Sequence, residues 1–140
     1  MKILGFNFTK IHIEKKKDFF KELKINSEVN VSDIKEVKQD ILKSKGELLG
    51  IKFRYGMDYS PDIAKIEIEG DILASVELKI AKEVLKKWKN KETPDEFKIP
   101  LFNLIFKKAG LKALELEDEM NLPLHIQMPT IRKKEESSDK

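Results

Sequence analysis

Two histidines, His12 and His125, are the only classical metal-binding side chains besides carboxylates in this 140-residue sequence, which contains no cysteine. The two lie far apart and form no His-x-x-x-His pair of the kind that holds zinc. Without cysteine, thiolate ligands, a thiol nucleophile and disulfide bonds are all excluded. His125 stands between Leu124 and Ile126, which favours a surface or interface position. The sequence therefore predicts no metal site.

Paired carboxylates are the next group that could do chemistry, because they can act as general acid and base. Glu67 and Glu69 alternate with Ile66 and Ile68, so they share one face of a strand, and this alternation is typical of a solvated face. A second acidic cluster falls late in a predicted helix and is also interpreted as a solvated face: Glu115, Glu117, Asp118 and Glu119.

The sequence contains no Gly-x-Ser-x-Gly elbow, no Gly-x-Gly-x-x-Gly turn and no phosphate loop. It therefore predicts a protein that is not an enzyme and that needs no cofactor.

A row of lysines beside Trp88 raises the question of nucleic acid, since ammonium groups bind phosphates and indole rings stack on bases. The row consists of Lys79, Lys82, Lys86 and Lys89. However, the chain has only two arginines, the residues that make bidentate contacts with phosphates and bases, and its net charge is only +3. Trp88 also belongs to the apolar stripe of its helix. Nucleic-acid binding is therefore disfavoured.

These residues must be positioned by a single domain, given the chain length. No run of 18 apolar residues is present, so no membrane span is expected. The first residues alternate in polarity, which predicts a strand and not a signal peptide. Together with the absence of cysteine, this favours the cytoplasm.

Alternating apolar residues predict four strands. In the first, the parity changes near Thr9 and Lys10, which requires a bulge or a strong twist. The second strand has a register break as well. A turn at Pro61 joins the last two strands, and Gly70 is expected at a bulge or a close backbone approach. The strands are expected over residues 2–14, 29–37, 49–59 and 64–74, with residues 38–46 as a loop.

Two helices are predicted to follow. Ser75 is the expected N-cap of the first, which ends after Trp88. Thr93-Pro94-Asp95-Glu96 forms a capping-box pattern that starts a second helix over residues 94–120, kinked or restarted at Pro100. An extended segment over 122–131 and a disordered charged tail over 132–140 complete the chain.

The second helix is more apolar than one sheet requires. A surface helix normally carries one apolar stripe, but this helix carries two. The first stripe contains Phe102, Ile105, Phe106, Ala109, Ala113, Leu116 and Met120. The second contains Leu101, Leu104, Leu111 and Leu114. Either the first helix covers the second stripe, or another subunit or a ligand does, and we predict an oligomer interface there.

Several short motifs occur in an order that resembles a known family. They are Tyr59-Ser60-Pro61, Ile68-Glu69-Gly70, Trp88, and the segment Asn121-Leu122-Pro123-Leu124-His125-Ile126-Gln127-Met128-Pro129. One long strand, a crossover with paired phenylalanines, three more strands, two helices and a Leu-Pro tail accompany them. Over residues 1–131 this pattern resembles the SecB family of export chaperones, and especially archaeal SecB-like proteins.

The resemblance implies an α+β domain with a four-stranded antiparallel sheet backed by helices. It further implies a homotetramer built as a dimer of dimers, and ATP-independent holding of unfolded or pre-export polypeptides in apolar grooves. The client-binding residues would be Phe19, Phe20, Leu23, Ile25, Val29 and Val31. Bacterial SecB proteins are typically acidic and end in a tail that docks the export motor. This chain is slightly basic and ends Lys-Glu-Glu-Ser-Ser-Asp-Lys, so motor docking is not expected.

An alternative remains open from the sequence. A small oligomeric adaptor or antitoxin-type protein, which binds one specific protein partner, would show the same surplus of apolar surface.

Overall fold

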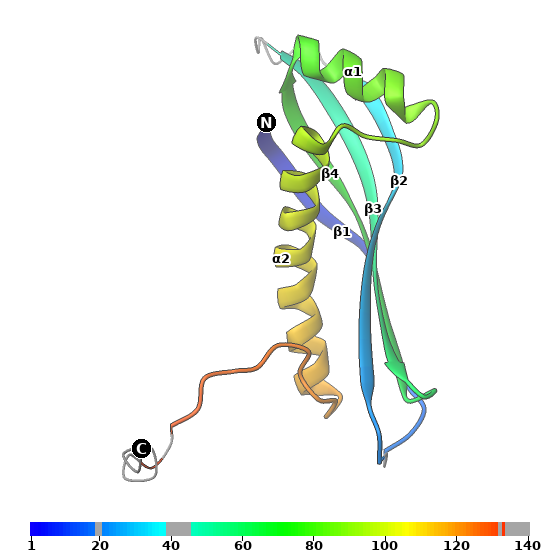
Figure 1. Cartoon of the computed structure of the whole chain (residues 1–140), viewed down its shortest axis with the longest axis vertical. Helices are drawn as coiled ribbons and strands as arrows, with labels where there is room; N and C mark the ends of the chain where they lie inside the picture. Colours follow the sequence, from blue (N-terminus) through cyan, green and yellow to red (C-terminus); the bar gives the residue numbers. More distant parts are fainter. Residues whose placement is uncertain (19–20, 39–45, 132, 134–140) are drawn as a thin grey trace.

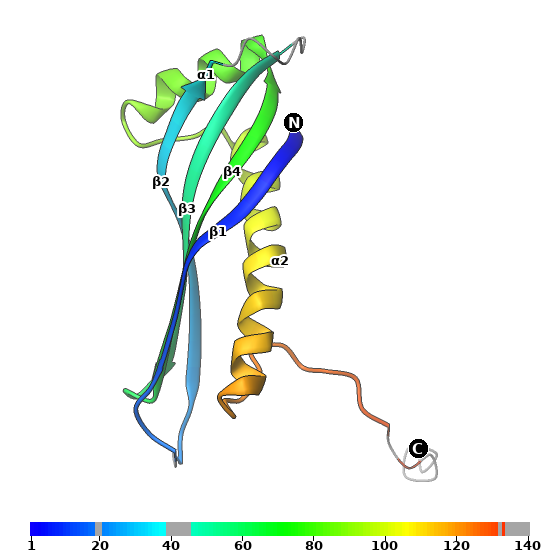
Figure 2. The same cartoon turned by 180° about the vertical axis from the view of Figure 1, so that it is seen from behind.

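One four-stranded antiparallel sheet, packed against two helices, makes up the computed structural model, which describes residues 1–18, 21–38, 46–131 and 133. The strands are β1 (Lys2–Lys15), β2 (Lys24–Val37), β3 (Gly46–Ser60) and β4 (Ala64–Glu77), and their order across the sheet is β1-β4-β3-β2. Both helices lie on the same face of the long, twisted sheet (Figures 1 and 2). The predicted α+β class is confirmed.

The two central strands carry the core because they alternate strictly. Phe53, Tyr55 and Tyr59 of β3 and Ile66 and Ile68 of β4 are fully buried on the helix side. Their sequence neighbours point to the opposite, polar face. As predicted, β3 and β4 pair directly, although β4 extends three residues further than expected.

The predicted bulge in β1 is confirmed. The register with β4 shifts between Phe8 and Lys10, so that Phe8 lies opposite Gly70 while Ile11 lies opposite Ile68. In β1 the apolar residues change from even to odd positions near this point. The extra residue in the bulge allows the apolar side chains on both sides of it to point to the same face of the sheet. A second shift, between Ile3 and Gly5, leaves Leu4 40% exposed, outside the row of inward side chains.

The close approach predicted at Gly70 is also confirmed. A Cβ atom there would overlap the carbonyl oxygen of Asn7 and the ring of Phe53. Glycine therefore lets β1 and β3 pack tightly on either side of β4.

The register break predicted for β2 lies between Val31 and Asp33. Because of it, Val29, Val31 and Ile34 all point to the helix side, opposite Tyr55, Phe53 and Ile51. The strand itself begins five residues before the expected position, at Lys24.

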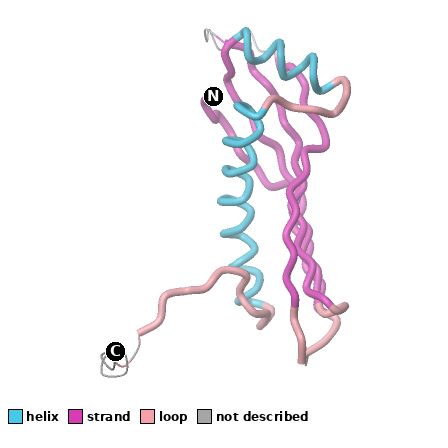
Figure 3. Tube along the Cα trace, in the orientation of Figure 1, coloured by secondary structure: helices cyan, strands magenta, loops and turns pink. Residues whose placement is uncertain are grey.

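The helices are α1 (Leu78–Trp88) and α2 (Asp95–Glu119), and Figure 3 shows them as two separate coils. Both predicted caps are wrong. Ser75 lies within β4, and Glu77 occupies the N-cap of α1 without a side-chain hydrogen bond. Pro94, not Thr93, is the N-cap of α2, and its carbonyl accepts the backbone N–H of Phe97 at 3.0 Å and of Lys98 at 2.9 Å. The helix continues through Pro100.

Past α2 the chain runs out as an extended segment, away from the sheet (Figure 1). Leu122 is buried at its base, whereas Ile126 and Met128 are about half exposed. Apart from Lys133, the residues of the expected disordered tail lie outside the described part of the chain.

Candidate functional site

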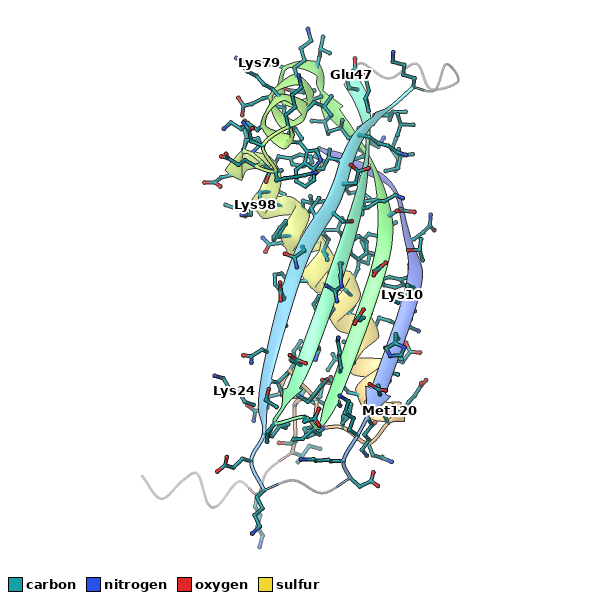
Figure 4. The ribbon with its side chains drawn as sticks, turned by 90° about the vertical axis from the view of Figure 1, so that its right-hand side faces the viewer. Lys10, Lys24, Glu47, Lys79, Lys98 and Met120 are labelled. Carbon is teal, nitrogen blue, oxygen red and sulfur yellow. The ribbon has the colours of Figure 1, made fainter. Side chains whose placement is uncertain are left out.

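A hollow of about 680 Å³ lies beside the outer strand β2, where the turn between the helices passes the sheet. Figure 4 shows the sheet with α2 behind it, and Lys98 lies beside the outer strand β2. Its walls come from β2, from the end of α1 with the linker that follows, and from the start of α2. The lining residues are Val29, Asn30, Val31, Ser32, Trp88, Lys91, Glu92, Thr93, Lys98 and Phe102. We call this hollow the β2 groove.

The β2 groove borders an open sheet edge. Strand β2 pairs with β3 on one side, and no strand of the described chain pairs with its other side. An unpaired edge presents backbone N–H and C=O groups that an extended polypeptide can bind as an added strand. Val29 and Val31 supply apolar side chains next to this edge, and Val31 is only partly buried.

Two lysines stand over the aromatic rings of the groove. The Nζ atom of Lys91 lies 4.7 Å from the centroid of the Trp88 ring, and that of Lys98 lies 5.4 Å from the centroid of Phe102. These cation–π contacts favour ammonium positions close to the apolar walls. Neither lysine forms an ion pair with a carboxylate in the described residues.

The turn after α1 fixes the position of Lys91. Its backbone is left-handed, with φ of 60°, and its N–H donates to the carbonyl oxygen of Trp88 at 2.8 Å. The N–H of Glu92 then donates to the carbonyl oxygen of Lys87 at 3.1 Å, closing the helix end. The linker therefore leaves α1 in a defined direction and forms one wall of the groove.

The predicted client-binding residues that the structure describes lie in β2 or just before it. The groove contains Val29 and Val31. Leu23 and Ile25 are half-buried near the start of the strand, where Ile25 pairs with Tyr59. The structure therefore does not bring them into the groove, but Ile25 points to the same face as the two valines. Phe19 and Phe20 lie outside the described residues.

The predicted interface residues on α2 separate into two groups. Leu101 is completely buried within the chain, which corrects its assignment to an interface. Its position four residues before Ile105 places both on the same helix face, against the sheet. Leu111 is 59% exposed, and Leu104 and Leu114 are half-buried. The interface prediction then rests on these three leucines.

A buried polar cluster was missed by sequence reasoning. Glu117 is fully buried, so its interpretation as part of a solvated face is wrong. The hydroxyl of Tyr59 donates a hydrogen bond to Glu117 Oε2. Glu117 Oε1 lies 2.8 Å from His125 Nδ1 and accepts the backbone N–H of His125 at 3.2 Å. The spacing of residues along α2 could have indicated this burial. Glu117 follows Ala113 by four residues and therefore lies on the same, buried side of the helix.

This cluster joins three parts of the chain: β3, α2 and the segment after α2. Burial, with the Glu117 carboxylate adding to it, raises the pKa of Tyr55 to about 12, and burial together with the hydrogen bond to Glu117 raises the pKa of Tyr59 as well. Lys15 Nζ donates a hydrogen bond to the carbonyl oxygen of Met120 at 3.0 Å, which connects the end of α2 to β1. A carboxylate without solvent access cannot meet a substrate, so the cluster is a structural anchor.

The strand carboxylates point to the face opposite the helices, where the side chain of Glu69 is 40% exposed but that of Glu67 only 15%. Glu67 lies 2.9 Å from the Nζ of Lys65, 3.4 Å from Nη2 of Arg54 and 3.5 Å from the Nζ of Lys10. Its hydrogen bond with Lys65 lowers its pKa to about 2, which makes it a poor base. In the described residues no three His, Asp or Glu side chains gather as a metal site, and no helix is long and apolar enough to cross a membrane.

The sequence matches no family model and no curated protein at a significant level. Among solved structures, the chain is similar to a SecB-like chaperone of Mycobacterium tuberculosis, whose structure contains a peptide from an antitoxin. The TM-score is 0.57 at 12% identity, and the match covers 94% of this chain and 91% of the other. The fold is therefore SecB-like.

Proposed function

We propose that this protein is an ATP-independent chaperone of the cytoplasm, which holds unfolded or pre-export polypeptides in the β2 groove. The observation that carries the proposal is a hollow in which apolar and aromatic side chains stand among polar ones, directly beside the edge of β2 that no strand of the described chain pairs with. The SecB-like fold supports it, and so does the polypeptide bound by the similar chaperone.

Binding would combine two physical contributions. The edge of β2 supplies backbone hydrogen bonds, which do not depend on the client's sequence. The side chains that point inward from the client bury apolar surface on Val31, Trp88 and Phe102, at roughly 25 cal/mol per Å². The proposed binding includes no covalent step and uses neither a nucleotide nor a cofactor.

The remaining predicted residues extend this proposal. Phe19, Phe20, Leu23 and Ile25 would lengthen the client surface toward the start of β2. Leu104, Leu111 and Leu114 would join subunits into a tetramer, a dimer of dimers, and the exposed Leu111 is their most accessible member.

An aggregation assay without nucleotide tests the function. The protein should suppress aggregation of several unrelated unfolded proteins at near-stoichiometric ratio. Val31→Gln should weaken this suppression, because it places an amide on the apolar wall. Leu78→Gln is the matched control, since Leu78 is 46% exposed and lies outside the groove. No suppression by the native protein, or an equal loss in both variants, would contradict the proposal.

A second candidate is the adaptor or antitoxin-type protein with one partner. The short groove favours it, because only four consecutive residues of β2 line the hollow, and a single short segment would fill it. This candidate predicts tight binding of one protein and no effect on unrelated unfolded chains in the same assay.

A further inference from the structure

We propose that the β2 groove selects extended segments in which apolar or aromatic residues are combined with acidic ones, and that Lys91 and Lys98 determine this selectivity. The inference rests on the proposed function of the groove as a polypeptide site and names the chemistry of its preferred ligand.

The charge of the groove is the first observation. Its lining contains two lysines and one acidic residue, Glu92, and the other members are apolar or neutral. Since neither Lys91 nor Lys98 is neutralised by a carboxylate in the described part of the chain, both ammonium groups are available to a ligand. An acidic side chain would gain ion pairs there, whereas a basic side chain would meet like charge.

The position of these charges is the second observation. Each ammonium lies over an aromatic ring, so charge and apolar surface occur at the same place in the groove. Lys91 and Trp88 belong to the α1 side, and Lys98 and Phe102 to α2. A segment that only buries apolar side chains would leave both ammonium groups unused, and a segment that is only acidic would leave the rings uncovered. The pairing favours ligands that offer both.

The chain's own extended segment does not compete for the groove. Residues 122–131 alternate apolar groups in a client-like pattern, at Leu124, Ile126 and Met128, but they contain no acidic residue. In addition, the contact between His125 and Glu117 holds the segment at the C-terminal part of α2. Glu117 is fifteen residues from Phe102, roughly 22 Å along the helix, and three residues of extended chain beyond His125 span only about 10 Å. Met128 therefore cannot reach the groove of its own chain while this anchor is intact.

Fluorescence anisotropy with labelled peptides tests the proposal. Three twelve-residue peptides would share the same apolar and aromatic positions and carry Glu, Gln or Lys between them. We expect the Glu peptide to bind about two- to twentyfold more tightly than the Gln peptide, and the Lys peptide to bind more weakly still. The differences should shrink at 1 M salt, because exposed charges are screened.

Variants assign the effect to the two lysines. Lys91→Glu with Lys98→Glu should reverse the order of the peptides, and Lys91→Gln with Lys98→Gln should abolish it. The control is Lys82→Glu with Lys86→Glu, which changes the net charge by the same amount at exposed positions of α1 outside the groove. This control should bind the three peptides in the same order as the native protein.

Three results would overturn the proposal. Equal binding of the three peptides, or an equal reversal by the control variant, would overturn the selectivity alone. Absence of binding by every peptide would also remove the groove as a polypeptide site, so the two failures are distinguishable.

Discussion

The carboxylate of Glu117 shows at the scale of single residues what the sequence could not predict. Runs of acidic residues are usually solvated, and the three neighbouring acids Glu115, Asp118 and Glu119 are indeed exposed. The burial of Glu117 depends on Tyr59, which is 58 positions away in sequence, and on the return of the chain at His125. The spacing from Ala113 could place Glu117 on the buried side of α2, but the contact with Tyr59 leaves no local pattern in the sequence.

Removing the hydroxyl of Tyr59 should destabilise the fold. Tyr59→Phe deletes a hydrogen bond and leaves a buried acceptor without this partner, which typically costs about 1–3 kcal/mol. Urea unfolding measures the loss. Tyr55→Phe is the control, because it removes a hydroxyl from the same strand without deleting the bond to Glu117. If both variants lose the same stability, the anchor is not specific to Tyr59.

The two tyrosines should make the protein sensitive to alkali. An unfolded tyrosine loses its proton near pH 10, whereas the folded pKa of Tyr55 is about 12 and that of Tyr59 is also raised. Above pH 10 the folded state therefore binds more protons than the unfolded state, and the free energy of unfolding falls as pH rises. Unfolding midpoints between pH 8 and 11.5 should show this decline, and the double change Tyr55→Phe, Tyr59→Phe should flatten it. A decline that persists unchanged in the double variant would refute the assignment.

At the scale of elements, the alternation of apolar residues predicted the strands, whereas the capping residues did not predict where the helices begin. The parity changes in β1 and β2 predicted real register shifts, because a buried face must stay on one side of the sheet. The helix caps failed because β4 runs on through Ser75 to Glu77, and because the carbonyl of Pro94 receives the bonds expected near Thr93. The core of the sheet could thus be predicted, but the groove could not. Its wall is a linker whose path is set by the left-handed turn at Lys91.

The outward leucines of α2 lead to a test of assembly. Leu111→Glu should dissociate the oligomer, because an unpaired charge at a buried interface costs about 3–5 kcal/mol. Since Leu111 is 59% exposed within one chain, the subunit itself should stay folded. Mass from light scattering and circular dichroism measure the two effects. Ile99→Glu is the matched control, as an apolar residue of the same helix that is 58% exposed. A native protein that is monomeric at micromolar concentration would contradict the interface.

At the scale of the whole molecule, client capture should extend beyond the groove. The double change Phe19→Ala, Phe20→Ala should leave the melting temperature and the oligomer mass nearly unchanged, and weaken binding of unfolded chains at least tenfold, about 1.4 kcal/mol. Phe97→Ala is the contrasting variant, because Phe97 is buried in the core and its truncation should cost about 3–5 kcal/mol of stability. A large fall in melting temperature with unchanged client affinity in the Phe19, Phe20 variant would place these residues in the core instead.

The register shifts in β1 and β2 also bear on whether the strand edges could stack into fibres. A strand edge that accepts extended chains would also accept the edge of another copy, and endless stacking of sheets follows when two long, regular edges meet. Both outer strands are 14 residues long, but β1 is interrupted by two shifts and β2 by one. A flexible client can adapt to such interruptions, whereas a second rigid sheet cannot. We therefore expect the same irregularities that keep apolar side chains on one face to disfavour pairing between the edges of two copies.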